Sequence, residues 1–307
     1  MPVVSIRHLT TYRYRNPVAF GEHRMMFRPL ESFDQRLISA EVGITPDPAL
    51  LRHIHDVGGA CVGVARFQGR SEILSFESRV RVDHQPQVAF DLEGEEGAIG
   101  QPPFSYSADE VADLARSIAR RHPDEDGAVA AWARRFLRPM GRTRLSALLS
   151  DMAQSIRQDF KYAVRLEGAP QSPAATLSLR RGSCRDFALL MIEAARSLGL
   201  AAQFVSGYVY SSSAKAGRAG GGHTHAWVRV YLPACGWVDF DPTNGIVGNI
   251  DLIRVAVVND PRQALPLHGT WAGLPSDYLG MDVTVQVGVE ADVVAQPARP
   301  MRVAQGR

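Results

Sequence analysis

The chain of 307 residues has little of the chemistry that marks several large classes of protein. Its three cysteines, Cys61, Cys184 and Cys235, are odd in number and far apart, which argues against a disulfide framework and predicts a reducing, cytoplasmic location. No run approaches about 18 uninterrupted apolar residues, so we expect no transmembrane helix. The first residues lack a basic start followed by a long apolar run, so we expect no secretory signal.

The chain also carries almost no net charge. It has 34 Lys and Arg against 32 Asp and Glu, a net of +2, and no long run of one sign. This balance argues against nucleic-acid binding and against attachment to an anionic membrane. Hydrophobic residues make up 45% of the chain and charged residues 21%, which is typical of a globular protein with a sizeable core. At about 150 residues per domain, the length predicts two domains.

The N-terminal third has the pattern of β-strands. Alternating residues such as Val4, Ile6 and His8 keep a two-residue period, and similar runs follow, separated by turn signals such as Asn16-Pro17. Short strands at this spacing predict an antiparallel β-sandwich. We assign it to residues 1–95, although the acidic, Gly-rich stretch after residue 90 already has the composition of a linker.

The rest of the chain mixes helices and strands, which makes the predicted fold α+β. Helical patterns are followed by strand patterns and a Gly-rich loop. We assign residues 104–290 to a catalytic domain and 291–307 to a flexible tail. The expected helices cover 107–121, 126–138, 143–160 and 182–199, the expected strands cover 201–210, 225–232 and 236–241, and the loop covers 211–222.

The segment 182–199 predicts a buried helix with a cysteine at its start. Ser183 and Asp186 resemble a capping box, and Gly199 stands where a left-handed cap ends a helix. Cys184 therefore falls in the first turn, where the helix dipole favours an anion and should lower the thiol pKa below its free value of about 8.5. A thiolate there is a prepared nucleophile, although an arbitrary cysteine is more often a small buried hydrophobic residue.

Two strand patterns downstream predict a hairpin that carries a base and its carboxylate partner. If 233–235 form a three-residue turn, Leu232 pairs with Gly236, and Asp241 lies diagonal to His225 on the same face. A turn of two or four residues would place them on opposite faces. The same register sets Asp239 opposite Arg229, so we expect those two to pair while Asp241 orients the imidazole.

Cys184, His225 and Asp241 are thus candidates for a nucleophile, a base and a group that orients the base. Attack of the thiolate on an amide carbonyl would give a thioester and expel an amine, which His225 protonates. Water would then complete a hydrolysis, and an amine would complete a transfer. A metal site built from His223, His225, Asp241 and Cys184 is a rival interpretation, disfavoured because no further Cys or His cluster lies near Cys184.

The sequence resembles the bacterial transglutaminase-like family, through motifs that keep their order. They are GSCRDFA at 182–188, LGLAA at 198–202, VSGY at 205–208, HAWV at 225–228 and GWVDFDPTN at 236–244. The resemblance implies a papain-like transglutaminase core, with a helical lobe that includes the buried Cys helix packed on an antiparallel sheet, and Cys184, His225 and Asp241 as its triad. HLTTYRY at 8–14, with Pro17, Arg28-Pro29, Gln35 and Asp56, resembles the β-domain that precedes this core.

We therefore expect a cysteine enzyme that acts on amide bonds of peptides or glutamine side chains, a protease, amidase or acyltransferase. The alternative is an inactive binding module on the same fold. The expected partner is a peptide or protein substrate, with no cofactor or metal, and no oligomeric state is indicated. Many relatives have a Gly-Arg-Asp-Tyr-like segment after the core, and residues 257–267 differ from it, which puts any role of this segment in substrate binding in doubt. Candidate substrate contacts are Tyr162, Arg185, Trp227 and Trp237.

Overall fold

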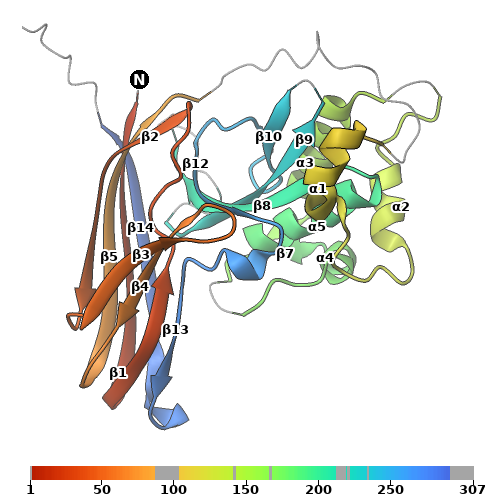
Figure 1. The fold of residues 1–307 in the computed structure, drawn as a ribbon. Coiled ribbons are helices and arrows are strands. Elements are labelled where there is room, and N and C mark those ends of the chain that lie inside the picture. Colours follow the sequence, from red (N-terminus) through yellow and green to blue (C-terminus); the bar gives the residue numbers. More distant parts are fainter. Residues whose placement is uncertain are drawn as a thin grey trace, which may run out of the picture.

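The computed structural model describes residues 2–86, 104–140, 143–165, 168–211, 219, 222–233 and 235–290. The expected linker after residue 90 and the expected tail at 291–307 lie outside these residues, as does most of the loop at 211–222. The described part is α+β, as predicted. Figure 1 shows a large sheet on one side of the molecule and helices gathered on the other, with a second sheet between them.

The large sheet is built around one long strand, β1 (Val3–Met25). Its seven strands are antiparallel, with the central order β2-β5-β1-β4-β3. Alternate residues of the first half of β1, including Val4, Ile6 and His8, are buried, because successive side chains of a strand point to opposite faces. The other strands of this path are β2 (Gln35–Thr45), β3 (Leu50–His55), β4 (Cys61–Arg66) and β5 (Arg70–His84).

The strand β1 continues through Asn16-Pro17, where the sequence predicts a turn. The pairing of β1 with β5 shifts register between Arg13 and Val18, so the proline occupies an irregular stretch of the strand. Pro lacks an N–H and is tolerated at such irregularities. Because β1 is not interrupted, the strands expected to form a sandwich are hydrogen-bonded into a single sheet.

Two C-terminal strands complete this first sheet. Strand β14 (Tyr278–Glu290) pairs with the first half of β1, from Val3 to Tyr14, and β13 (Leu267–Ala272) pairs with the second half. The expected domain boundaries, 1–95 and 104–290, assign both strands to the catalytic domain, and here the prediction needs correction. Strand β14 pairs with the same stretch of β1 as β5 does, on the side that β5 leaves open.

The second sheet has five strands in the order β11-β10-β9-β8-β12. The expected hairpin is present, with Gly236 paired to Leu232 and Asp239 to Arg229, so the turn contains three residues as predicted. The strands are β8 (Ala202–Val209), β9 (His225–Leu232), β10 (Gly236–Asp241), β11 (Ile246–Val247) and β12 (Leu252–Val258).

The helices occur at the predicted places, with one addition. Ser107 and Glu110 form the capping box that starts the first helix. The short helix α4 was not predicted from the sequence. The helices are α1 (Ala108–Ile118), α2 (Ala128–Arg134), α3 (Leu145–Asp159), α4 (Pro173–Leu179) and α5 (Cys184–Ser197), and the short elements among and after them are β6 (Lys161–Tyr162), β7 (Arg181–Gly182), η1 (Pro261–Gln263) and η2 (Pro275–Asp277).

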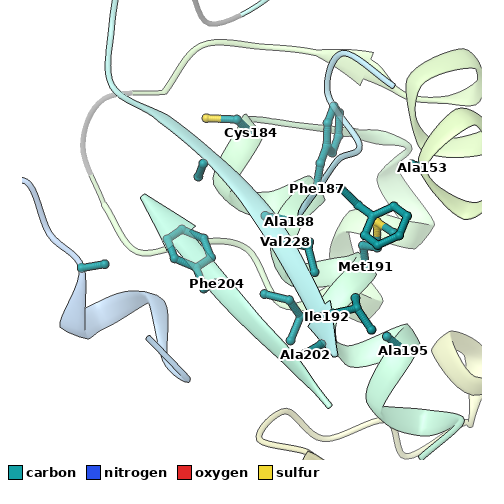
Figure 2. Packing of buried hydrophobic residues seen from close by; sticks show 14 of the residues in the cluster. Ala153, Cys184, Phe187, Ala188, Met191, Ile192, Ala195, Ala202, Phe204 and Val228 are labelled. Carbon is teal, nitrogen blue, oxygen red and sulfur yellow. The ribbon is translucent and has the colours of Figure 1, made fainter. Parts of the chain in front are cut away.

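Helix α5 lies at the centre of the core. Nearly all of its residues are buried, and it packs against β8 and β9. Figure 2 shows Phe187, Met191 and Ile192 of this helix packed near Phe204 and Val228 of the two strands. The helix ends at the predicted left-handed glycine, Gly199, whose φ is 90°. A helix so enclosed holds its first residue in a fixed position relative to the sheet.

Buried hydrogen bonds join the first sheet to the core. Nδ1 of His8 lies 3.0 Å from the hydroxyl of Tyr208, and Nδ1 of His84 lies 2.8 Å from that of Tyr210. Arg254 of β12 forms an ion pair with Asp34, which directly precedes β2 of the first sheet. Polar groups buried in this way are costly to separate, so the two parts are held in one arrangement. In the part of the chain that the structure describes, no helix is long and apolar enough to cross a membrane.

Candidate active site

Cys184 is the first residue of α5, as the sequence predicts. Asp186 accepts a hydrogen bond of 2.7 Å from the backbone N–H of Ser183, which fixes the start of the helix. The side chain of Cys184 is 7% exposed and lines a cavity. Figure 2 shows its sulfur at the edge of the apolar cluster, pointing away from the other labelled side chains. The thiol therefore faces the cavity from the positive end of a helix dipole.

His225 and Asp241 lie side by side at the ends of β9 and β10. Nε2 of His225 is 2.8 Å from Oδ2 of Asp241, and both side chains are fully buried. The three-residue turn makes this contact, since it sets the two residues diagonally on one face of the hairpin. The backbone N–H of Thr243 also donates to Asp241, at 2.9 Å. The carboxylate is thus held on both of its oxygens.

The other ring nitrogen of His225 faces the cysteine. Nδ1 has no hydrogen-bond partner in the described structure, and His225 and Cys184 line the same cavity. Burial alone would lower the pKa of His225, but Asp241 and then the nearby Cys184 raise it to about 10. The pKa of the buried Asp241 is lowered, because its contact with His225 and the bonds from Asn244 outweigh the effect of burial. The structure brings the three predicted residues together.

Asn244 is a member of this cluster that was not singled out from the sequence. Its side-chain amide donates to Oδ2 of Asp241 at 2.8 Å and to the carbonyl of Ala219 at 3.1 Å, and its oxygen accepts from the N–H of Ala219 at 2.8 Å. It therefore connects the carboxylate to the loop that precedes His225. The signal for it was its place three residues after Asp241, within the motif at 236–244.

Tyr162, a predicted substrate contact, lines the cavity beside Cys184. It belongs to β6, which pairs with β7 immediately before the cysteine helix. Burial, followed by the neighbouring Cys184, raises the pKa of the Tyr162 hydroxyl. A phenol with a raised pKa stays protonated in the physiological range, so it is available to donate a hydrogen bond.

Arg185 also lines the cavity, but its guanidinium supports the protein itself. It donates to the carbonyls of Gly168 at 3.0 Å and of Arg165 at 2.8 Å. Arg165 in turn forms an ion pair of 2.5 Å with the fully buried Asp186. Through these contacts, the residue after the cysteine holds Arg165 and Gly168, which both line the cavity.

The two tryptophans lie elsewhere, and their predicted substrate contacts need correction. Trp227 is 0% exposed, stacks on His225 and donates from Nε1 to Asp239 at 3.0 Å. Trp237 lies at the start of β10, where its ring is covered by the guanidinium of Arg229 at 4.5 Å. Neither is among the described residues that line the cavity.

The expected ion pair between Asp239 and Arg229 is also replaced. Although these residues are opposite in register, the carboxylate of Asp239 accepts from Arg254 of β12, at 3.0 Å, and from Trp227. The competing guanidinium comes from β12, which is three places away from β10 in the sheet. Asp239 therefore helps to fix Trp227 under the imidazole of His225.

The cavity has a volume of about 470 Å³ and lies between the core and the first sheet. Part of its lining comes from β1 and β14, and part from the segment 261–267, whose role the sequence left in doubt. The charged lining residues are Arg165, Arg185 and Arg262, and none of the described lining residues is an aspartate or glutamate. His223 lines the cavity as well, two residues before β9 begins at His225.

Within the described ranges, no group of three or more His, Cys, Asp or Glu side chains is arranged to hold a metal ion. The rival interpretation with His223, His225, Asp241 and Cys184 therefore has no support from the geometry. His225 and Asp241 instead contact each other, in a geometry that suits proton transfer to and from the imidazole.

Comparison with known proteins agrees with this arrangement. Residues 131–242 match the transglutaminase-like superfamily, and residues 4–83 match the bacterial transglutaminase-like N-terminal region. The predicted resemblance is confirmed, because one part of the chain is similar to the core and another to the N-terminal region of the bacterial transglutaminase-like proteins. Cys184, His225 and Asp241 all lie within the matched core.

Among curated relatives, an uncharacterized protein of Mycobacterium tuberculosis strain H37Rv is 29% identical over 276 residues, which are 86% of each chain. An uncharacterized protein of Mycobacterium leprae is 30% identical over 178 residues, 58% of this chain and 55% of that protein. A crystal structure from Cytophaga hutchinsonii, described as a candidate cysteine protease, is similar with a TM-score of 0.65 and 16% identity over 95% of this chain and 92% of that one. The likeness confirms the predicted fold.

Proposed function

We propose that the protein is a cysteine enzyme that cleaves amide bonds of peptides or of glutamine side chains through a thioester. The observation that carries this proposal is the orientation of His225. Its Nε2 is bound to Asp241 at 2.8 Å, which leaves Nδ1 for the thiol of Cys184. This is the order nucleophile, base and orienting carboxylate that thiol-dependent acyl transfer needs.

The reaction follows from these positions. Sγ of Cys184 attacks the amide carbonyl, and its proton resides on Nδ1 of His225, where the carboxylate of Asp241 stabilises the imidazolium. The carbonyl oxygen becomes an oxyanion, which the N–H groups at the start of α5 and the hydroxyl of Tyr162 stabilise. The C–N bond then breaks, the amine leaves with the proton from His225, and a thioester remains. Water, deprotonated by His225, attacks the thioester and releases the acid and the thiol.

Water is the acceptor that the cavity favours over a lysine side chain. An alkylammonium approaching the thioester would be held best by a carboxylate, and none of the described lining residues is one. The arginines that line the cavity offer a cation no acceptor. We therefore propose that the main reaction is hydrolysis, so that the protein is a protease or amidase. We also propose a peptide or protein as its substrate and the cytoplasm as its location.

Mass spectrometry with a library of glutamine-containing peptides tests the proposal. The library is incubated with the wild type and with Cys184→Ala, each with and without a primary amine. Cleavage adds one water and splits the peptide, deamidation of a glutamine replaces its amide nitrogen by oxygen, and transfer to that glutamine adds the amine with loss of ammonia. We expect cleavage or deamidation that depends on Cys184. If neither product nor amine incorporation differs between the two proteins, the proposal is wrong and the inactive module is the better interpretation.

A further inference from the structure

The wall of the cavity opposite the core is supplied by the first sheet. Thr10 and Tyr12 of β1 and Met281 and Val283 of β14 line the cavity that contains Cys184. The two strands pair so that Tyr12 is opposite Met281 and Thr10 is opposite Val283. These four side chains therefore share one face of the sheet. We call them the sheet wall.

The sheet wall is attached firmly to the catalytic strands. The N–H of Val285, two residues after Val283, donates to the carbonyl of Gly222 at 3.0 Å, and Gly222 stands three residues before His225. His8, on the same face of β1, bonds Tyr208 of β8 at 3.0 Å and Thr10 at 3.2 Å. The position of the wall relative to Cys184 and His225 is thus set by buried hydrogen bonds.

The lining on either side of the sheet wall is apolar. The buried Phe204, the exposed Val164, and Leu265 and Leu267 of the returning segment also contact the cavity. Apart from the reacting cysteine and histidine, the charged side chains among the described lining residues are arginines. Arg165 is neutralised by the buried Asp186 behind it, and Arg262 by Asp260, at 2.5 and 2.6 Å. A neutral apolar group gains contact here, and a basic group finds no partner among the described lining residues.

We propose that the sheet wall, with its apolar neighbours, binds the side chain of the substrate residue next to the reacting amide. The substrate is then a peptide with a large apolar or aromatic residue at that position, and not Lys or Arg. This inference rests on the proposed function, because it places that side chain in the cavity of Cys184. It makes the N-terminal sheet a part of the active site that selects the substrate. The volume of about 470 Å³ accommodates an aromatic side chain with the adjoining backbone.

The test compares peptides that differ only in the residue beside the reacting amide, with Phe, Leu, Ala or Lys in turn. For the wild type we expect kcat/KM for the Phe and Leu peptides to exceed that for the Lys peptide by about tenfold to one hundredfold. Met281→Glu places a carboxylate on the sheet wall. It should raise kcat/KM for the Lys peptide about tenfold relative to kcat/KM for the Phe peptide. Met281→Ala, which adds no charge, should reduce the preference for Phe over Ala.

The matched control is Thr284→Glu. Thr284 belongs to the same strand but is exposed and stands on the opposite face from Met281 and Val283. The same charge placed at Thr284 should leave the order of the kcat/KM values of the four peptides unchanged. If Met281→Glu and Met281→Ala keep the wild-type order, or if the wild type accepts the Lys peptide as well as the Phe peptide, the inference is wrong while the proposed function stands.

A second readout keeps the two proposals apart where turnover is too slow to measure. Peptidyl chloromethyl ketones ending in Phe or Lys alkylate a cysteine, because the sulfur displaces chloride and a carbon–sulfur bond forms. We expect the Phe reagent to label Cys184 at least about tenfold faster than the Lys reagent, with Met281→Glu narrowing the ratio. Equal rates would contradict the substrate inference. Labelling of Cys184 no faster than that of Cys235 would contradict the proposed function itself.

Discussion

The imidazole of His225 and the carboxylate of Asp241 are 2.8 Å apart, at the ends of adjacent antiparallel strands. This contact determines which ring nitrogen is left for the thiol. It also holds the pKa of His225 at about 10 against the opposite effect of burial, so the ring is protonated at neutral pH. When the imidazole has taken up the proton of the thiol, the nucleophile is ready and the imidazolium can protonate the leaving amine.

Asp241→Asn should remove this effect while keeping the shape of the side chain. An amide does not stabilise the imidazolium, so the pKa of His225 should fall, because burial then acts without the opposing effect of Asp241. We expect kcat to fall by about a hundredfold to ten-thousandfold, the range expected for loss of an orienting carboxylate. Measurement of kcat/KM against pH checks this. Asp239→Asn is the control, since it should lower the stability of the protein without changing the pH profile of kcat/KM. If Asp241→Asn has the same pH profile as the wild type, the role of Asp241 is contradicted.

Asn244→Ala should weaken catalysis with little effect on binding. The change removes a hydrogen bond of 2.8 Å to Asp241 and both contacts with Ala219, so the imidazole should lose part of its orientation. We expect kcat to fall about tenfold with KM nearly unchanged. The acid side of the pH profile should move to higher pH, because Asp241 loses a donor that lowers its pKa. Asn259→Ala, which removes a bond to Ser117 of α1, is the matched control. A lower stability with unchanged kcat and pH profile would show that Asn244 is only structural.

Tyr162→Phe tests the donor for the oxyanion. The ring can keep its packing near Phe187, at 6.3 Å between centroids, while the hydroxyl beside Cys184 is lost. We expect kcat to fall about tenfold to a thousandfold, with the free energy of unfolding changed by about 1 kcal/mol or less. Tyr106→Phe provides the comparison, because its hydroxyl bonds the backbone of Ala201 and Tyr231 instead. That variant should lose stability and retain activity; the reverse pattern would contradict the assignment.

Acid should destabilise the contact between the first sheet and the core. Burial lowers the pKa of His8 and of His84 to about 4, against about 6.5 in the unfolded chain. Above pH 6.5 both rings are neutral in either state. As pH falls from 6.5 to 4, only the unfolded chain takes up protons, so the free energy of unfolding falls by up to about 1.4 kcal/mol per pH unit for each histidine.

Urea unfolding between pH 7.5 and pH 4.5 measures this slope. His84→Gln removes one titrating group and should make the slope shallower, whatever it costs at pH 7.5. His53→Gln on the exposed strand β3 should leave the slope unchanged. A wild type whose stability is constant between pH 6.5 and pH 4.5 would contradict the burial of neutral histidines at this interface.

The features that sequence reasoning captured are those with a local cause. The position of Cys184 follows from capping residues and helical periodicity within one segment, and the contact of His225 with Asp241 follows from counting residues across one short turn. Such patterns need no knowledge of the rest of the chain. The family resemblance rests on the same local motifs.

The features that were missed depend on distant parts of the chain. The alternation of Met281, Val283 and Val285 indicates a strand but not that its partner is β1, more than 260 residues earlier. Arg254 displaces Arg229 at Asp239 because β12 reaches the same buried carboxylate, and Trp227 is turned towards that carboxylate rather than the cavity. The cavity wall is therefore a product of tertiary structure that no single segment encodes.

Alkylation of Cys184 by iodoacetamide, followed by mass spectrometry across pH 5 to 11, tests the joint action of thiol, imidazole and carboxylate most directly. In the wild type we expect Cys184 to react many times faster than Cys61 and Cys235 at neutral pH, because the adjacent imidazolium stabilises its thiolate. We expect that advantage to disappear in His225→Ala and to shrink in Asp241→Asn. If Cys184 reacts at the rate of Cys235 in the wild type, or if His225→Ala leaves its rate unchanged, the three side chains do not act together.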